Sequence, residues 1–305
     1  MASPPISPLL LCLDGSTGVC SVALVSRYPG DRGQVGSWTV PAHRQEGDGR
    51  AQAKVLLRLI DEMLHEVGAE PRSLSGVVVG TGPGTFTGVR ITVATARALA
   101  LALSIPVVGV STLAVLAASA AAAGLQADVI AAVVDARRNQ VFYGIYTREK
   151  ADAGAEPRWV RAKPFGVCDR DVLGERVLPE IAAGAGTSGD ADGRSIAVVG
   201  EDMALVPDLT PGLRFVREEI RADYLVLGQD RLTEPGLLPE GDRLAPWLLS
   251  EACFAAAPRL RPPAVRGVGE PGTPESVKPI YVRSPDADIY ITKMRDPWAA
   301  KPAGA

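Results

Sequence analysis

Histidine, aromatic residues and excess positive charge are all scarce in this chain of 305 residues. It has two histidines and four cysteines, 5% of its residues are aromatic, and 32 basic residues stand against 35 acidic ones, a formal net charge of -3. His43 and His65 are too far apart to share one face of a helix and the cysteines form no close pair, so the pattern indicates no metal centre. A slightly acidic chain also lacks the broad basic surface with which a protein holds nucleic acid by itself.

The N-terminal residues, the cysteines and the longest uncharged stretch favour a cytoplasmic protein. Residues 1–8 have no basic n-region, so we expect no signal peptide, and we expect the cysteines to be reduced and mostly buried. Residues 98–125 carry no charge over enough length to span a bilayer, but Pro106 and Gly109 interrupt them. A buried helix, a short strand and a second helix fit this stretch better than a membrane span. We expect His43 in a loop and His65 on the exposed side of a helix.

Two pairs of apolar strands organise the chain. Residues 9–13 end at Asp14 and are followed by a second strand at 20–25, while residues 129–134 end at Asp135 and are followed by a strand at 141–146. A strand, an acidic turn and a strand at the start of each half predict an internal duplication. The other expected elements are strands at 35–40, 76–79, 106–110, 158–164 and 196–199, and helices at 49–67, 87–103 and 112–123.

This pattern predicts an α/β protein with two lobes. The first lobe is expected at 1–110 and the second at 111–258, with a flexible insertion near 182–195. Residues 259–305 read as a Pro/Gly-rich linker and C-terminal tail.

The glycine-rich loop at 80–88 joins the strand at 76–79 to a long helix. It has no lysine for a P-loop, and Thr85 stands where a dinucleotide fingerprint needs glycine. Two interpretations stay open. The loop lines a nucleotide or a partner, or it lets the helix pack close to the sheet while Thr85 or Thr87 caps that helix.

Five blocks resemble one known family: LLCLDGSTGVCSVALV, GTGPGTFTGVRITVATARALA, PVVGVSTLAVLA, VVDARRNQVFYGIY and PIYVRSPDA. They are spread over residues 9–287 and are similar to the bacterial TsaB (YeaZ) family. The resemblance implies the two-lobed actin-like ATPase fold, which is a duplicated RNase H-like (ASKHA) fold.

The resemblance also implies a function. Members of this family are non-catalytic scaffold or dimerisation subunits of the bacterial complex that adds threonylcarbamoyl to the adenosine 3′ of the anticodon in ANN-decoding tRNAs. The implied partners are the catalytic paralogue TsaD, as a heterodimer, and the ATPase subunit TsaE; tRNA is reached through the complex, and no membrane is involved. No cofactor is required by this subunit, and ATP or ADP is expected, if at all, in the assembled complex. A homodimer in the absence of the partner stays open.

No catalytic residue is assigned, but part of a phosphate-binding site is retained in the pattern. The alternative is a turn in which Asp14 and neighbouring hydroxyls cap backbone amides, and no second acidic group for catalysis is evident in the sequence. The candidate residues of a vestigial nucleotide or phosphate site are Asp14, Ser16, Thr17, Gly82, Gly84, Thr85, Asp135 and Arg137.

The helices at 49–67 and 87–103 carry more apolar residues than one core face requires. In the family such helices form a four-helix bundle with the catalytic subunit, which would leave their extra apolar residues exposed in the free chain. The alternative is that both helices are simply buried in the monomer. The expected partner interface comprises Val55, Leu59, Arg90, Val93, Ala96, Arg97 and Ala100.

Three other functions compete with the scaffold. An ATP-binding phosphotransferase or ATPase of the same fold needs a pair of carboxylates across the cleft. A metallopeptidase needs a histidine pair that the chain does not have. An RNA-binding module is disfavoured by the acidic net charge.

Overall fold

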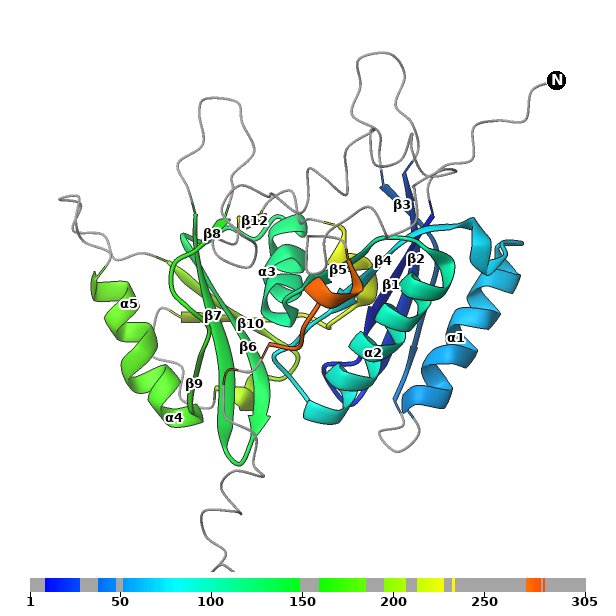
Figure 1. The fold of residues 1–305 in the computed structure, drawn as a ribbon. Coiled ribbons are helices and arrows are strands. Elements are labelled where there is room, and N and C mark those ends of the chain that lie inside the picture. Colours follow the sequence, from blue (N-terminus) through cyan, green and yellow to red (C-terminus); the bar gives the residue numbers. More distant parts are fainter. Residues whose placement is uncertain are drawn as a thin grey trace, which may run out of the picture.

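Two β-sheets stand side by side in the molecule, each with helices on its outer face and one helix between them (Figure 1). The structure, a computed structural model, describes residues 9–27, 38–47, 52–148, 159–184, 195–206, 213–227, 232–233, 273–280 and 282. The insertion expected at 182–195 falls largely outside these residues, as do Cys253, most of the linker at 259–275 and the tail. The boundaries proposed for the two lobes stay a prediction.

The first sheet has the strand order β3-β2-β1-β4-β5. β1 is antiparallel to β2 and parallel to β4, and β2 is antiparallel to β3. The strands are β1 (Leu9–Asp14), β2 (Cys20–Arg27), β3 (Trp38–Glu46), β4 (Leu74–Gly80) and β5 (Val107–Val110).

The third strand differs from the sequence expectation. β3 continues to Glu46, because it pairs along β2 until Glu46 lies opposite Cys20. The prediction of a strand ending at residue 40 is therefore wrong at its C-terminal end. His43 lies on this strand opposite Ala23, so the expectation that it belongs to a loop is also wrong.

The faces of the first sheet follow the alternation of β1. Leu9, Leu11 and Leu13 pack in one core cluster with the helices α1 (Gln52–Glu66) and α2 (Phe86–Leu103). The intervening Leu10 and Cys12 point to the opposite face, where they join a second cluster. Both faces of this strand are thus buried, as its unbroken apolar sequence requires.

The second sheet repeats this plan. Its order is β11-β10-β6-β7-β8-β12, with β9 also paired to β7. The hairpin β6–β7 is antiparallel, and β10 and β11 run parallel to β6. The strands are β6 (Val129–Arg137), β7 (Gln140–Arg148), β8 (Trp159–Arg161), β9 (Gly166–Asp169), β10 (Ile196–Gly200), β11 (Leu213–Arg217) and β12 (Leu232–Thr233).

The outer face of the second sheet is covered by a helical segment. It runs through α4 (Arg170–Val172), a π-helical stretch (Leu173–Val177) and α5 (Leu178–Gly184), seen at the far left of Figure 1. Leu173 and Leu178 pack there against alternate residues of β6.

The helix α3 (Thr112–Ala122) fills the space between the sheets. The Ser111 side chain caps it by accepting hydrogen bonds from the amides of Leu113 and Ala114. Its residues join the core cluster that also holds Leu10 of β1 and Ile130 of β6. The predicted succession of helix, strand and helix through 98–125 is therefore confirmed, and so is the two-lobed α/β architecture.

Two later segments cross back to the first lobe. A short 3₁₀ helix, η4 (Ala222–Leu225), leaves the second sheet and packs against β1, β2 and β4. Another, η8 (Pro274–Ser276), packs against α2, and the amide of Ile280 donates a hydrogen bond to the carbonyl of Thr81 at 2.7 Å. The first lobe is therefore completed by residues distant in sequence.

Candidate functional site

The turn after β1 buries a carboxyl group. Asp14 is 1% exposed, and its Oδ1 accepts hydrogen bonds from the amide and the hydroxyl of Ser16 at 2.8 and 2.6 Å. Its Oδ2 has no hydrogen-bond partner among the described residues. Burial raises the pKa of Asp14 to about 6, although the two bonds from Ser16 lower it. A perturbed carboxyl at the end of a strand is a feature of functional sites, although structural networks produce it as well.

The glycine loop closes directly onto this turn. The amide of Thr85 donates a hydrogen bond to the carbonyl of Ser16 at 2.6 Å, and the Thr85 hydroxyl lies within hydrogen-bond distance of the carbonyls of Gly15 and Thr17. Gly84 lies so close that a Cβ atom there would overlap the Ser16 carbonyl. The structure thus brings Asp14, Ser16, Thr17, Gly84 and Thr85 together, and their polar groups bond to one another with the exception of Oδ2 of Asp14.

The cap predicted for the long helix is only partly found. Thr85 occupies the N-cap position of α2, but its side chain makes no capping hydrogen bond. The expectation of a threonine side-chain cap at Thr85 is wrong, since this hydroxyl bonds to the β1–β2 turn instead.

The matching turn of the second lobe has a different chemistry. Asp135 is paired with arginines, since its Oδ1 accepts from Arg170 at 3.1 Å and its Oδ2 lies 3.2 Å from Nη1 of Arg137. Arg137, Arg138 and Asn139 all have positive φ angles of 53 to 62°. Arginine already neutralises Asp135, so the two turns are not equivalent.

A second carboxyl was missed from the sequence. Glu201 follows β10, and its pKa is raised by burial and, to a lesser degree, by the charge of Asp14. Its position directly after a buried strand, like that of Asp14, is the signal that could have identified it. The charge of Asp14 therefore acts on a carboxyl group that follows a strand of the other lobe.

Histidine and serine do not build a catalytic centre here. Within the described residues, no three His, Cys, Asp or Glu side chains gather as metal ligands. Ser21, His43 and Asp223 have the composition of a hydrolase triad, and Ser21 Oγ lies 3.2 Å from Nε2 of His43. Ser21 is fully buried, however, and its oxygen accepts a hydrogen bond from the amide of Ala222. It is therefore not placed to attack a substrate.

The expected partner interface divides into two groups. Its two arginines are accessible, with Arg90 exposed and Arg97 partly so. The five apolar members lie in the core between α1, α2 and the sheet, so the expectation that they are exposed is wrong. The buried members are Val55, Leu59, Val93, Ala96 and Ala100.

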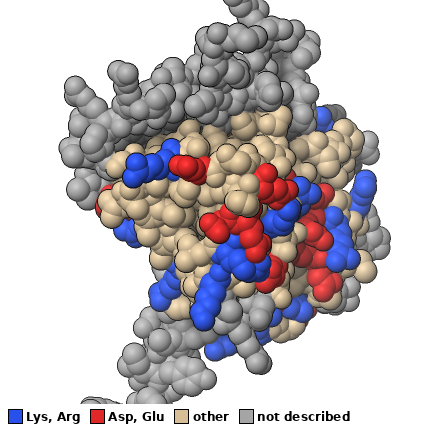
Figure 2. Space-filling model, turned by 90° about the vertical axis from the view of Figure 1, so that its right-hand side faces the viewer, with Lys and Arg blue, Asp and Glu red and all other residues tan. Residues whose placement is uncertain are grey.

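Other apolar residues of the same helices are exposed. Leu57 of α1 is 55% exposed, and Phe86 and Leu101 of α2 are 46% and 64% exposed. Ala94 and Ala98 are exposed as well. Figure 2 shows the α1 side of the molecule, where interleaved acidic and basic side chains border a broad area without charge.

α2 is unusual for a surface helix. By length and composition it is apolar enough to cross a membrane, and 33% of it is buried. It packs against β4 and α1, with Arg90 and Arg97 as its only charged residues. The Arg90 guanidinium lies over the Phe86 ring, 3.6 Å from its centroid. This exposed apolar face, rather than the predicted buried residues, is the candidate for contact with a partner.

Known proteins share both the sequence and the fold. Residues 43–158 match the family described as "TsaD: tRNA N6-adenosine threonylcarbamoyltransferase". The chain is 31% identical over 220 residues to the tRNA threonylcarbamoyladenosine biosynthesis protein TsaB of Haemophilus influenzae, which covers 71% of this chain and 86% of that protein.

Two solved structures from Pseudomonas aeruginosa are also similar. One is YeaZ, with a TM-score of 0.55 and 25% identity over 90% of this chain and 99% of that one. The other is an uncharacterized protein with similarity to peptidase YeaZ, with a TM-score of 0.57 and 27% identity over 90% of this chain and all of that one. The predicted resemblance is confirmed: this chain belongs to the TsaB (YeaZ) family.

Proposed function

We propose that the protein is a non-catalytic subunit in tRNA threonylcarbamoyladenosine biosynthesis that binds the catalytic paralogue TsaD as a heterodimer. Membership of the TsaB family supports the role in this modification. The observation that carries the binding role is α2, an apolar helix of 18 residues of which 33% is buried. An exposed apolar face of this kind usually marks the site of a partner.

The charge of this face describes the partner it fits. No acidic residue occurs between Glu70 and Asp128, so α2 contributes only the positive charges of Arg90 and Arg97. A partner helix with small apolar residues and carboxylates at its rim complements such a surface. Two copies of α2 packed on each other would bring like charges together. A homodimer is therefore the weaker alternative, for conditions in which the paralogue is absent.

The remaining roles follow from the same assignment. TsaE and tRNA join through the assembled complex in the cytoplasm, and this subunit requires no cofactor of its own. The contacts of the glycine loop support that view, because the Thr85 amide bonds to Ser16 rather than pointing into open space. ATP or ADP is then handled by the complex.

One observation favours a second candidate, an ATP-binding phosphotransferase of the same fold. Asp14 and Glu201 are carboxyls at strand ends of different lobes and interact electrostatically. ATP turnover by the isolated protein that Asp14→Asn abolishes would favour this candidate over the scaffold.

Size-exclusion chromatography with light scattering tests the scaffold directly. The protein is mixed with the TsaD paralogue of the same organism, and a 1:1 heterodimer is expected. The double variant Ala98→Glu/Leu101→Asp places charge on the exposed face of α2 and should abolish the complex, since it changes no buried residue of the helix.

Met203→Asp is the matched control. Met203 is 61% exposed, as Leu101 is 64% exposed, but it lies in the second lobe. The control should retain the heterodimer. If the α2 variant still forms the complex, the interface lies elsewhere on the molecule. If the folded wild-type protein forms no complex with TsaD, the scaffold role itself is contradicted.

A further inference from the structure

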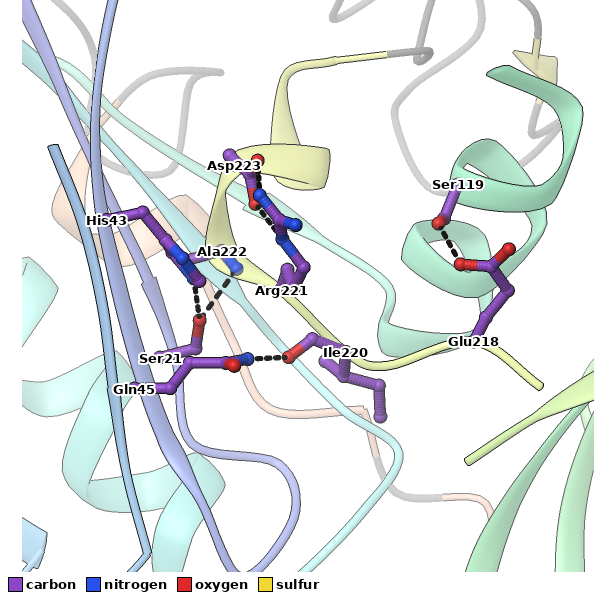
Figure 3. A network of polar contacts seen from close by, with 9 residues as sticks. All are labelled: Ser21, His43, Gln45, Ser119, Glu218, Ile220, Arg221, Ala222 and Asp223. Atoms are coloured by element: carbon purple, nitrogen blue, oxygen red, sulfur yellow. Dashed lines mark hydrogen bonds and ion pairs between the residues drawn. The ribbon is translucent and has the colours of Figure 1, made fainter. Parts of the chain in front are cut away.

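Residues 218–225, here called the strap, tie the second lobe to the first (Figure 3). The strap follows β11 and ends in η4, which packs on β1, β2 and β4. Its polar contacts with the first lobe and with α3 are few and specific. Gln45 donates to the Ile220 carbonyl at 3.2 Å, and the Ser119 hydroxyl donates to Glu218 at 2.6 Å.

The central contact of the strap is made to Ser21 of β2. The amide of Ala222 donates a hydrogen bond to Ser21 Oγ at 2.9 Å, in a place where both residues are buried. The Ser21 hydroxyl still has its own proton to donate, and Nε2 of His43 lies 3.2 Å from this oxygen. When Ser21 donates to Nε2, the imidazole is neutral and carries its proton on Nδ1.

Protonation of His43 would disturb this chain of bonds. Nε2 would become a donor, and the buried hydroxyl proton of Ser21 would lose its acceptor. The charged groups that face His43 are mixed: Arg221 and Arg44 oppose a positive imidazole, while Asp223 and Glu219 favour it. Burial is the largest influence and lowers the pKa of His43.

We propose that Ser21 and His43 form a proton-sensitive latch between the lobes, closed while His43 is neutral and loosened when its imidazole is protonated. The latch concerns the junction of the lobes and stands independently of the proposed partner.

β3, the strand that carries His43, is also linked to α1 by ion pairs. Alternate side chains of a strand point to opposite faces. His43 and Gln45 contact Ser21 and the strap, whereas Arg44 pairs with Glu66 at 2.5 Å and Glu46 pairs with Arg58. Loosening of the strap therefore acts on a strand that supports α1, and α1 packs against α2, the helix of the candidate partner face.

Hydrogen exchange measured by mass spectrometry tests the latch on the full chain. The readout is the protection of fragments spanning the strap at about pH 7.5 and about pH 5.5, corrected for intrinsic exchange rates. In the wild type we expect a severalfold loss of protection at the lower pH. His43→Gln should remove that difference, because glutamine keeps an acceptor but does not titrate.

The second histidine of the chain supplies the matched control. His65 lies exposed on α1, and His65→Gln should keep the behaviour of the wild type. Asp14 also titrates near this range, so the comparison between variants, rather than the wild type alone, decides the outcome. Equal pH dependence in the wild type and His43→Gln would overturn the latch.

A nuclear magnetic resonance titration covers the case in which His43→Gln does not fold. The two imidazoles of the wild-type chain are assigned with His65→Gln. The pKa of His43 should lie below the ordinary value of about 6.5 for histidine, because burial disfavours the charged form, and a pKa at or above that value would overturn the latch as well.

Discussion

The carboxyl group of Asp14 occupies the space that any side chain at position 80 would need. β1 and β4 are parallel neighbours with Leu13 opposite Val79, which places Asp14 beside Gly80. A Cβ atom at Gly80 would overlap Oδ2 of Asp14. The glycine that opens the distinctive loop is therefore required by the buried carboxyl of the neighbouring strand, whether or not a ligand ever approaches it.

Gly80→Ala should destabilise the protein strongly. The added methyl group must displace Asp14 or separate two paired strands, and overpacking of this kind costs about 1–3 kcal/mol. Urea unfolding measures the loss. Gly18→Ala is the control, because a Cβ at Gly18 has no neighbour within 4 Å. Similar losses in both variants would contradict the steric explanation, and Asp14→Ala in the Gly80→Ala background should recover part of the stability.

Asp14 should make stability fall as pH rises. Its pKa is about 6 in the folded chain against 3.8 without the fold, so between these values the native state holds a proton that the unfolded chain releases. The stabilising contribution of Asp14 is fully present below about pH 4 and is lost as pH rises through about 6. Above that pH the contribution no longer changes, and the total loss in the free energy of unfolding is roughly 3 kcal/mol. Asp14→Asn should abolish this decline in denaturant titrations between pH 4.5 and pH 8 (approximate limits chosen to bracket both values). An unchanged slope would show that another group is responsible.

Neighbouring alanines of α2 should respond in opposite ways to the same substitution. Ala96 is fully buried, and Ala98 is exposed. Ala96→Glu places a charge in the core and should cost about 3 kcal/mol or more, whereas Ala98→Glu should change stability by less than about 0.5 kcal/mol. Thermal unfolding of the isolated chain distinguishes them. Only Ala98→Glu can then report on partner binding without loss of the fold.

The ion pair of the strap should matter more than an ordinary surface pair. Asp223 is 2% exposed, and Arg221 contacts both of its oxygens at 2.7 and 3.1 Å. Arg221→Ala leaves a buried carboxylate without its partner and should cost about 2–3 kcal/mol, a value reduced because Arg221 is partly exposed. Addition of Asp223→Asn should restore part of this loss. A double-mutant cycle with no coupling would rule out the pair as a source of stability.

Local pattern was enough to predict much of the fold. The apolar runs before Asp14 and Asp135 predicted the two hairpins, because a buried strand and a polar turn are both encoded in adjacent residues. The uniformly apolar stretch of α3 likewise predicted a buried helix, and α3 lies between the two sheets.

The residues expected at the interface show what the local sequence pattern could not predict. Val55 and Leu59 lie beside the main apolar stripe of α1 and were expected on the surface. They are buried because α1 packs against both the sheet and α2, so its buried arc is wider than one stripe. Periodicity defines the apolar side of a helix, but the number of neighbours decides how much of it is covered.

The sequence alone determined the family, the two strand-turn-strand repeats and the position of Asp14 at a strand end, because each rests on adjacent residues. Only the tertiary structure decided that the charge of Asp14 raises the pKa of Glu201, and that Ser21 accepts a hydrogen bond from the amide of Ala222. These pairs are separated by about two hundred residues along the chain, and no local preference specifies such a contact. They exist because the two sheets pack around α3, which holds the end of β10 and the strap against the first lobe.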